Sequence, residues 1–328
     1  HHLAASALVP LGKDVDLAVR ATLCDTFANY GERDDAAVEV TFGLLSDDED
    51  VVRAACGGAM AVIATPAVWI PKLASQLDSP RTAAREGAIR ALGEMRVPEA
   101  FDLIRGRLAD PESSVVTLAL AAIGRFGDEA AAREIQPFLT DARRSVRIEA
   151  SAALARLPKD LVRNWVYEAL KDREPAVRIE ASAALERYPE DPETYIRLHA
   201  LLRDEESSVR GSVASSLALL HDARSFPALL AILADEPEEF VRTEVTLALG
   251  ACDGQRAVPH LIDRLDKAKG EENSMVLEVL MAATGQKIRP QQKLWQDWYR
   301  LAHPEGAPPV LGPAVPAVPA VPKPSDGP

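Results

Sequence analysis

The nine residues VRIEASAAL occur twice in this chain, at 146–154 and again at 177–185, an offset of 31 residues. Each copy has an aspartate five positions before its valine, Asp141 and Asp172. Self-similarity at a period of about 20–50 residues marks a stack of repeated supersecondary units. The repeat therefore predicts a chain in which each unit packs on its neighbours in the sequence.

The same frame extends in both directions from these two copies. Dipeptides equivalent to Val146-Arg147 stand at Val19-Arg20, Val52-Arg53, Ala84-Arg85, Val115-Val116, Val177-Arg178, Val209-Arg210 and Val241-Arg242, with a weaker match at Val276-Leu277. Apolar residues recur four, seven and eight positions after the valine, which is the spacing of one helical face. A second periodic segment precedes each valine, so we expect two antiparallel helices per unit and an all-α protein.

The pattern D-x-x-x-x-V-R-x-x-A-x-x-A-L resembles the HEAT repeat, in the short bacterial form also seen in phycobilin lyases, over roughly residues 3–283. This resemblance implies a right-handed α-solenoid of about eight helix pairs. It also favours a protein-binding scaffold or adaptor that uses the concave face of the solenoid. We expect no enzymatic activity, because the residues form no catalytic constellation. An alternative stays open, a phycobilin-lyase-like factor or chaperone that attaches a chromophore or prosthetic group.

The chain is expected to have three parts: a repeat solenoid over 1–283, a capping helix over 284–305 and a Pro-rich tail over 306–328. Trp295, Trp298 and Tyr299 share one face of the capping helix, where we expect them to close the last hydrophobic face of the stack. A ligand-stacking site is the alternative for these aromatic residues.

In the tail, the prolines between 313 and 322 recur every three residues. This period places one proline on each turn of a polyproline II helix. We expect a disordered, extended tail or linker, and the alternative is a docking motif for a partner.

A row of Asp and Arg residues is predicted to have a structural role. Aspartates stand before the second helix of most units, where we expect N-caps, at Asp14, Asp47, Asp110, Asp141, Asp172 and Asp204. An arginine one turn into a helix faces the positive end of the dipole, which is unfavourable alone. We therefore expect a ladder of Arg–Asp bonds within or between units, comprising Asp141, Arg147, Asp172, Arg178, Asp204 and Arg210, interrupted at Val116.

The surface of the second helices is the predicted binding site. The positions two and six residues after each frame valine point away from the core and are mostly small or apolar, at Thr117, Ala121, Ile148, Ala152, Ile179, Ala183, Thr243 and Leu247. Glu149, Glu180 and Glu244 border this strip. Apolar surface rimmed by charge indicates an interaction site. We expect a partner protein with an apolar, helical ridge flanked by Lys or Arg; the alternative is that tight curvature covers Ile148 and Ile179.

Other chemistry is not indicated by the sequence. The net charge of −13 argues against a nucleic-acid-binding surface, which needs clustered Lys and Arg. His199, His221 and His260 lie in different units without metal-ligand spacing. We expect no catalytic residue, no metal and no cofactor.

Further expectations concern the cysteines and the cellular location. Cys24, Cys56 and Cys252 are far apart in the sequence, so we expect buried thiols rather than a disulfide or zinc site. No span approaches the roughly 18 apolar residues that a membrane helix needs. The chain begins with His1 rather than Met, and we expect a cytoplasmic protein with a truncated N-terminus.

Overall fold

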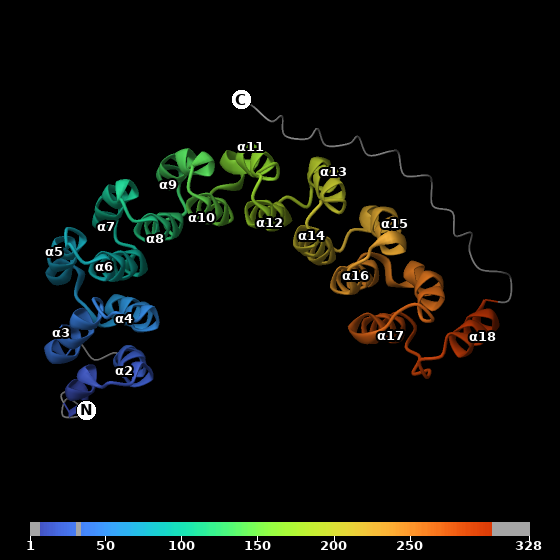
Figure 1. Ribbon diagram of the computed structural model, residues 1–328, viewed down its shortest axis with the longest axis horizontal. Helices are drawn as coiled ribbons and strands as arrows, with labels where there is room; N and C mark the ends of the chain where they lie inside the picture. The colour runs from blue at the N-terminus through green and yellow to red at the C-terminus, as the bar shows by residue number, and fades with distance from the viewer. Residues whose placement is uncertain (1–6, 31–33, 304–328) are drawn as a thin grey trace. The chain divides into compact units, whose positions relative to one another are not determined.

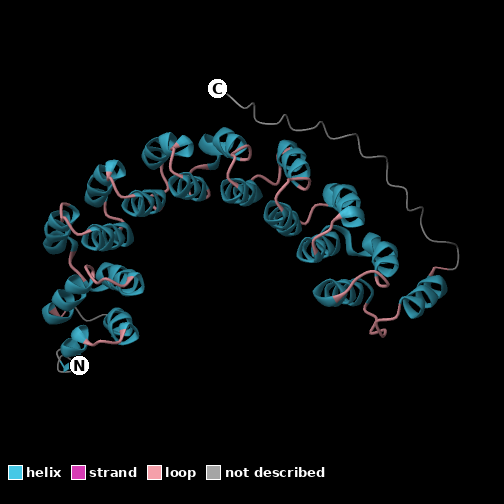
Figure 2. Cartoon of the chain, in the orientation of Figure 1, coloured by secondary structure: helices cyan, strands magenta, loops and turns pink. Residues whose placement is uncertain are grey.

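The computed structural model describes residues 7–30 and 34–303, and within them every regular element is a helix (Figures 1 and 2). The all-α fold predicted from the repeat is confirmed. The chain divides into two compact units, of which unit 1 ends at Trp165 and unit 2 begins at Val166. This boundary falls inside α11 (Lys159–Ala169).

Unit 1 is a stack of helix pairs in two layers. Its second helices are α2 (Leu17–Tyr30), α4 (Asp50–Ile63), α6 (Thr82–Met95), α8 (Ser113–Gly124) and α10 (Arg144–Leu154). Its first helices are η1 (Val9–Lys13), α3 (Asp35–Leu44), α5 (Pro66–Leu77), α7 (Pro98–Arg105) with η2 (Gly106–Ala109), and α9 (Glu129–Ile135) with η3 (Gln136–Thr140). Each second helix contacts the second helix of the next pair, so these helices form one continuous layer of the unit (Figure 1).

Unit 2 continues the pairing. Its elements are α12 (Pro175–Ala184), η4 (Leu185–Arg187), α13 (Pro192–Leu201), α14 (Ser207–Leu220), η5 (Ala223–Ser225), α15 (Phe226–Asp235), α16 (Glu239–Arg264), α17 (Gly270–Thr284) and α18 (Gln292–Ala302). In α16, Asp253 has extended backbone (φ −162°, ψ 83°), which separates the second helix of one pair from the first helix of the next. The weaker sequence match at Val276 lies in α17, where its side chain is fully buried.

The repeated apolar positions form the core. The frame residues Val52, Val115, Val146, Val177 and Val209 are all completely buried. Full burial of such a side chain stabilises the fold by about 1.5–3 kcal/mol. One close approach requires glycine, because a Cβ at Gly87 would lie 1.9 Å from the carbonyl oxygen of Leu45.

The frame aspartates differ from the prediction that they are N-caps. The N-cap of α4 is Glu49 and that of α10 is Arg143, in each case two residues after the aspartate. The Asp47 carboxylate accepts a hydrogen bond from the Glu49 N–H at 2.9 Å, and Asp141 accepts one from Arg143 at 2.8 Å. The same bond recurs at Asp14, Asp110, Asp172 and Asp204. These aspartates therefore form Asx turns before the helices, and their carboxylates can also accept hydrogen bonds from an arginine.

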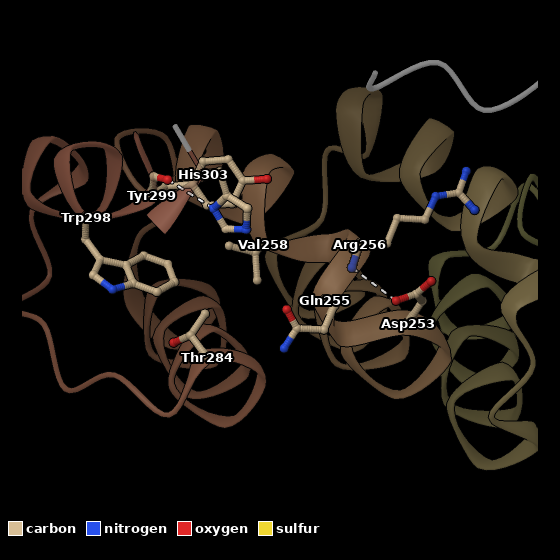
Figure 3. Close-up of a pocket in the computed structure, with 8 residues that line it drawn as sticks. All are labelled: Asp253, Gln255, Arg256, Val258, Thr284, Trp298, Tyr299 and His303. Carbon is tan, nitrogen blue, oxygen red and sulfur yellow. Dashed lines mark hydrogen bonds between the residues drawn. The ribbon is translucent and has the colours of Figure 1, made fainter. Parts of the chain in front are cut away.

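The C-terminal helix α18 packs against α16. Its Trp295 is fully buried, whereas Trp298 and Tyr299 are half-buried and line a pocket together with residues of α16 (Figure 3). The predicted Pro-rich tail over 306–328 lies outside the described residues. Within the described helices, none is long and apolar enough to cross a membrane.

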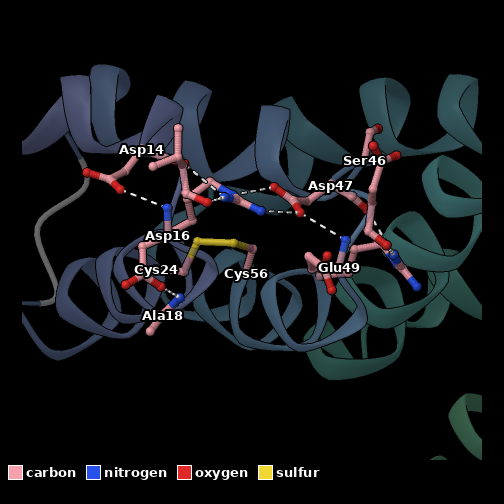
Figure 4. A network of polar contacts seen from close by, with 12 residues as sticks. Asp14, Asp16, Ala18, Cys24, Ser46, Asp47, Glu49 and Cys56 are labelled. Carbon is pink, nitrogen blue, oxygen red and sulfur yellow. Dashed lines mark hydrogen bonds and ion pairs between the residues drawn. A yellow bond between two sulfur atoms is a disulfide. The ribbon is translucent and has the colours of Figure 1, made fainter.

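The expectation of three buried thiols is wrong for two of the cysteines. Cys24 of α2 and Cys56 of α4 form a disulfide, with their Cα atoms 5.0 Å apart (Figure 4). They are 32 residues apart in the sequence, close to one repeat, and adjacent second helices bring such positions side by side. Distance along the sequence is therefore a poor guide to proximity in a stack of repeats. Cys252 is a buried thiol, and burial raises its pKa to about 11.

Candidate functional site

Most frame arginines form buried or mostly buried ion pairs with an acid of the following repeat. We call this set the arginine row, and its pairs are Arg20–Asp47, Arg53–Glu86, Arg85–Asp110, Arg178–Asp204, Arg210–Glu236 and Arg242–Glu272. In the pair of α12, Arg178 donates from Nε and Nη2 to the two Asp204 oxygens at 2.8 and 2.6 Å. Its Nη1 donates to the carbonyl oxygen of Asp172 at 2.8 Å. The row thus links consecutive repeats through their turns, as Figure 4 shows around Asp47.

Three of the acids in the row are glutamates that sequence reasoning missed. The third repeat has Ser79 where its neighbours have aspartate, and Arg53 bonds Glu86 of α6 instead, at 2.8 Å. Glu272 is fully buried and accepts from Arg242 Nε at 2.7 Å and from Arg264 Nε at 2.6 Å. Because position 79 is not an aspartate, the sequence could have indicated that Arg53 pairs with a different acid.

The fourth repeat has no row arginine, because Val116 occupies that position. The next aspartate, Asp141, is bonded by Arg143 of its own turn, with both contacts at 2.9 Å. These bonds hold the pKa of Asp141 below its usual value. Arg147 donates to the carbonyl oxygen of Asp141 at 2.9 Å. These bonds of Arg143 and Arg147 hold the turn that precedes α10.

A hollow of about 210 Å³ opens on the second-helix layer of unit 1. We call it the second-helix hollow, and it is lined by Ala54 of α4, Arg90 and Glu94 of α6, and Leu118, Ala121, Ala122 and Arg125 of α8. Ion pairs stand at its edge: Arg90 Nη2 lies 2.8 Å from Asp50 Oδ1, and Arg125 Nη1 lies 2.6 Å from Glu94 Oε1. The hollow therefore combines an apolar surface with charges of both signs.

The predicted strip residues of unit 1 lie on α8 and α10. Thr117, Ala121, Ile148, Glu149 and Ala152 are all half-buried. Ala121 is the one predicted position that lines the second-helix hollow. Sequence reasoning missed Leu118, which stands three residues after its frame valine, where the next repeat has Glu149.

The predicted strip residues of unit 2 lie on α12 and α16. Ile179 and Glu180 are half-buried, and Ala183 is exposed. Leu247 is 40% exposed. The Glu244 carboxylate accepts a hydrogen bond from the Ser215 hydroxyl of α14 at 2.8 Å.

A catalytic arrangement is not evident among the described residues. His199 Nε2 lies 3.0 Å from Ser225 Oγ, but Ser225 is fully buried and so closed to a substrate. Burial also lowers the pKa of His199. Tyr167 has its pKa raised to about 12, first by burial and then by its hydrogen bond to Asp191. In residues 7–30 and 34–303, no three His, Cys, Asp or Glu side chains are grouped to hold a metal ion.

Comparison with known proteins agrees with the repeat frame. The sequence profile of HEAT repeats matches residues 70–155 and 196–281, together more than half of the chain. The X-ray structure of Escherichia coli YibA is similar with a TM-score of 0.57 and 17% identity, over 76% of this chain and 92% of that one. No curated protein matches the chain in sequence. The predicted resemblance to HEAT-repeat proteins is confirmed.

The expectation that the chain is not an enzyme is contradicted by two further structural neighbours, which are enzymes. The CpcE–CpcF complex of phycocyanin lyase from Nostoc is 14% identical over 75% of this chain and 94% of that one, with a TM-score of 0.41. Human deoxyhypusine hydroxylase is 21% identical over 77% and 96%, with a TM-score of 0.35. Neither likeness assigns an activity to the chain.

Proposed function

The chain belongs to the HEAT-repeat family, and we propose that it is a protein-binding scaffold whose second-helix layer receives a segment of a partner protein. In unit 1 the segment enters the second-helix hollow. The family fold supports a binding role because stacked repeats present extended surfaces for partners. The location of the site rests on the side chains of α4, α6 and α8.

The observation that carries the proposal is the chemistry of the hollow. Leu118 and Ala121 present apolar surface next to the Arg90–Asp50 and Arg125–Glu94 pairs. Apolar surface rimmed by charge is typical of interaction sites. The rim arginine Arg125 is 38% exposed, so its guanidinium can exchange its present contact for one with a partner.

The partner segment has an apolar ridge, with a side chain such as Leu or Met entering the hollow. The volume of about 210 Å³ is below the roughly 300–1,000 Å³ of pockets that enclose drug-sized ligands. This size favours a protein side chain over a bilin or another chromophore. On unit 2, Glu180 and Glu244 stand beside Ile179 and Leu247, where basic flanking residues of the partner would be complementary.

Leu118→Asp tests the site directly. A carboxylate in the apolar part of the hollow should abolish recovery of the partner by affinity purification and quantitative mass spectrometry, because the apolar side chain of the partner would desolvate it. Val68→Asp is the matched control, since Val68 is 56% exposed on the first helix α5. The control variant should recover the partner as the parent does.

Ile148→Asp and Ile179→Asp extend the same assay to the predicted strip of each unit. Partner loss with either variant, at an unchanged circular dichroism spectrum and melting temperature, would include that strip in the site. Equal recovery by Leu118→Asp and the parent would contradict the proposal. Transfer of a bilin to an acceptor protein, detected by absorbance, would instead support the chromophore-attachment alternative.

The Cys24–Cys56 disulfide bears on where the protein works. Disulfides persist in oxidising compartments and are rare in the reducing cytosol. The bond is therefore an argument against the expected cytoplasmic location. We propose that the scaffold functions in an oxidising compartment, which blocking of free thiols in freshly lysed cells before mass analysis would test.

A further inference from the structure

Unit 2 contains a second site, a pocket of about 330 Å³ between α16, the end of α17 and α18 (Figure 3). We call it the cap pocket, and it is lined by Asp253, Gln255, Arg256, Val258, Thr284, Trp298, Tyr299 and His303. Three of these side chains are rings on α18 and its end. The Tyr299 and His303 rings lie 4.2 Å apart between centroids, and Trp298 lies 6.3 Å from Tyr299.

Several polar groups of the cap pocket are already engaged. The Asp253 carboxylate accepts from the Arg256 N–H at 3.0 Å, and the Thr284 hydroxyl donates to the Leu280 carbonyl at 2.7 Å. The Arg256 guanidinium lies over the Phe226 ring, 4.4 Å from its centroid. The groups left for a ligand are chiefly ring faces, which suit a ligand with apolar faces and little charge.

A polyproline II peptide has these properties. It has flat apolar proline rings and backbone carbonyls without internal hydrogen bonds. Proteins recognise such peptides in grooves lined by aromatic side chains. The indole N–H of Trp298 makes no hydrogen bond to another described residue, so it can donate to one of these carbonyls.

The chain itself supplies such a segment. Its prolines at 313, 316, 319 and 322 have the three-residue period of polyproline II. The described residues end at His303, which lines the cap pocket, and nine residues separate it from the first of these prolines. Nine residues span up to about 30 Å when extended, and Gly306 and Gly312 among them permit a reversal of direction. We propose that residues 313–322 dock intramolecularly on the Trp298–Tyr299–His303 face of the cap pocket.

Fluorine NMR on the full chain tests this contact. The chain has four tryptophans; with 5-fluorotryptophan incorporated, Trp298→Phe assigns the Trp298 signal. Replacing the four periodic prolines by Ala should shift the Trp298 signal and leave the signals of Trp69, Trp165 and Trp295 in place. A synthetic peptide with the sequence of residues 312–323, added in excess, should return the shifted signal toward the parent position.

The matched control replaces four prolines outside the period, Pro308, Pro309, Pro324 and Pro328, by Ala, and should leave the Trp298 signal unchanged. The tail variant changes no residue of the helices, so a folding failure cannot imitate the result. An unchanged Trp298 signal in the tail variant, or no response to the peptide, would overturn the proposal. A parent signal that moves on tenfold dilution would overturn the intramolecular arrangement in favour of docking between two copies.

Discussion

The arginine row and the rim of the second-helix hollow use the same chemistry in opposite environments. In the row, Arg178 pairs with Asp204 at 2.6 Å, and the side chains are 7% and 8% exposed. At the rim, Arg125 pairs with Glu94 at the same distance of 2.6 Å, but the side chains are 38% and 41% exposed. The two pairs therefore have the same N–O distance and differ in how far their side chains are buried.

The difference decides what each arginine can do. Removing one partner from a buried pair leaves a desolvated charge, which typically costs about 3–5 kcal/mol. An exposed pair contributes about 0–1 kcal/mol, because water already solvates both ions. Arginines of the row are thus committed to the fold, and those of the rim are free to meet a partner at little cost to stability.

The largest expected effect follows from breaking a pair of the row. Arg178→Leu should lower the free energy of unfolding by about 3–5 kcal/mol, since Asp204 loses its counter-ion in a buried position. Urea denaturation followed by circular dichroism measures this loss. An unfolding curve that coincides with that of the parent would show that the row does not stabilise the repeats.

The disulfide is a covalent link between α2 and α4, the same second helices that the Arg20–Asp47 pair connects through their turns. Reduction should lower the stability of unit 1 by about 2–4 kcal/mol, the usual contribution of a disulfide. Differential scanning calorimetry with and without reductant measures the loss. Cys24→Ser with Cys56→Ser is the control and should not respond; detection of three reactive thiols in the unreduced, denatured parent would contradict the bond.

Acidification tests two carboxylates that are bonded by arginines, Glu236 of the row and Asp222 outside it. Burial by itself would raise the pKa of Glu236, but the bonds from Arg210 and the Glu238 N–H, with the charges of Arg210 and Arg242, together outweigh burial and hold the pKa below its usual value. Asp222, bonded by Arg224, has its pKa lowered to about 2. Groups with lowered folded-state pKa values contribute stability above their unfolded values of about 4 and lose it as the pH falls toward the folded values.

These two carboxylates should therefore not change the melting temperature near neutral pH, and their protonation should lower it between about pH 4 and pH 2. Arg224→Leu should remove the part of this fall that Asp222 contributes. An identical pH profile for Arg224→Leu and the parent would contradict the assignment of the pKa shift to that pair.

The smallest stability effect is expected at the rim. Arg125→Leu should change the free energy of unfolding by less than about 1 kcal/mol, because the Arg125–Glu94 pair is solvated. Measuring Arg125→Leu and Arg178→Leu under the same conditions compares the contribution of an exposed ion pair with that of a buried one. A loss at Arg125 equal to the loss at Arg178 would mean that the rim is a structural element and not an available surface.

The sequence predicted the helices and the core because a period of about 31 residues and buried valines such as Val146 are local properties of each repeat. It predicted a ladder of Arg–Asp bonds, but not every partner that a neighbouring repeat supplies. The Cys24–Cys56 bond and the Arg53–Glu86 pair each join residues more than 30 positions apart. The second-helix hollow was not predicted, because the position three residues after the frame valine is a glutamate in the next two repeats, Glu149 and Glu180, but a leucine, Leu118, in this one.

Hydroxyl-radical footprinting of the chain, alone and in complex with its captured partner, tests whether the partner binds the second-helix layer. Leu118 of α8 and Val68 of α5 report on the second-helix and first-helix layers of the same unit. We expect the partner to protect Leu118 from oxidation and to leave Val68 as reactive as in the free chain. Protection of Val68 with Leu118 unchanged would place the partner on the first-helix layer and contradict the proposed binding surface.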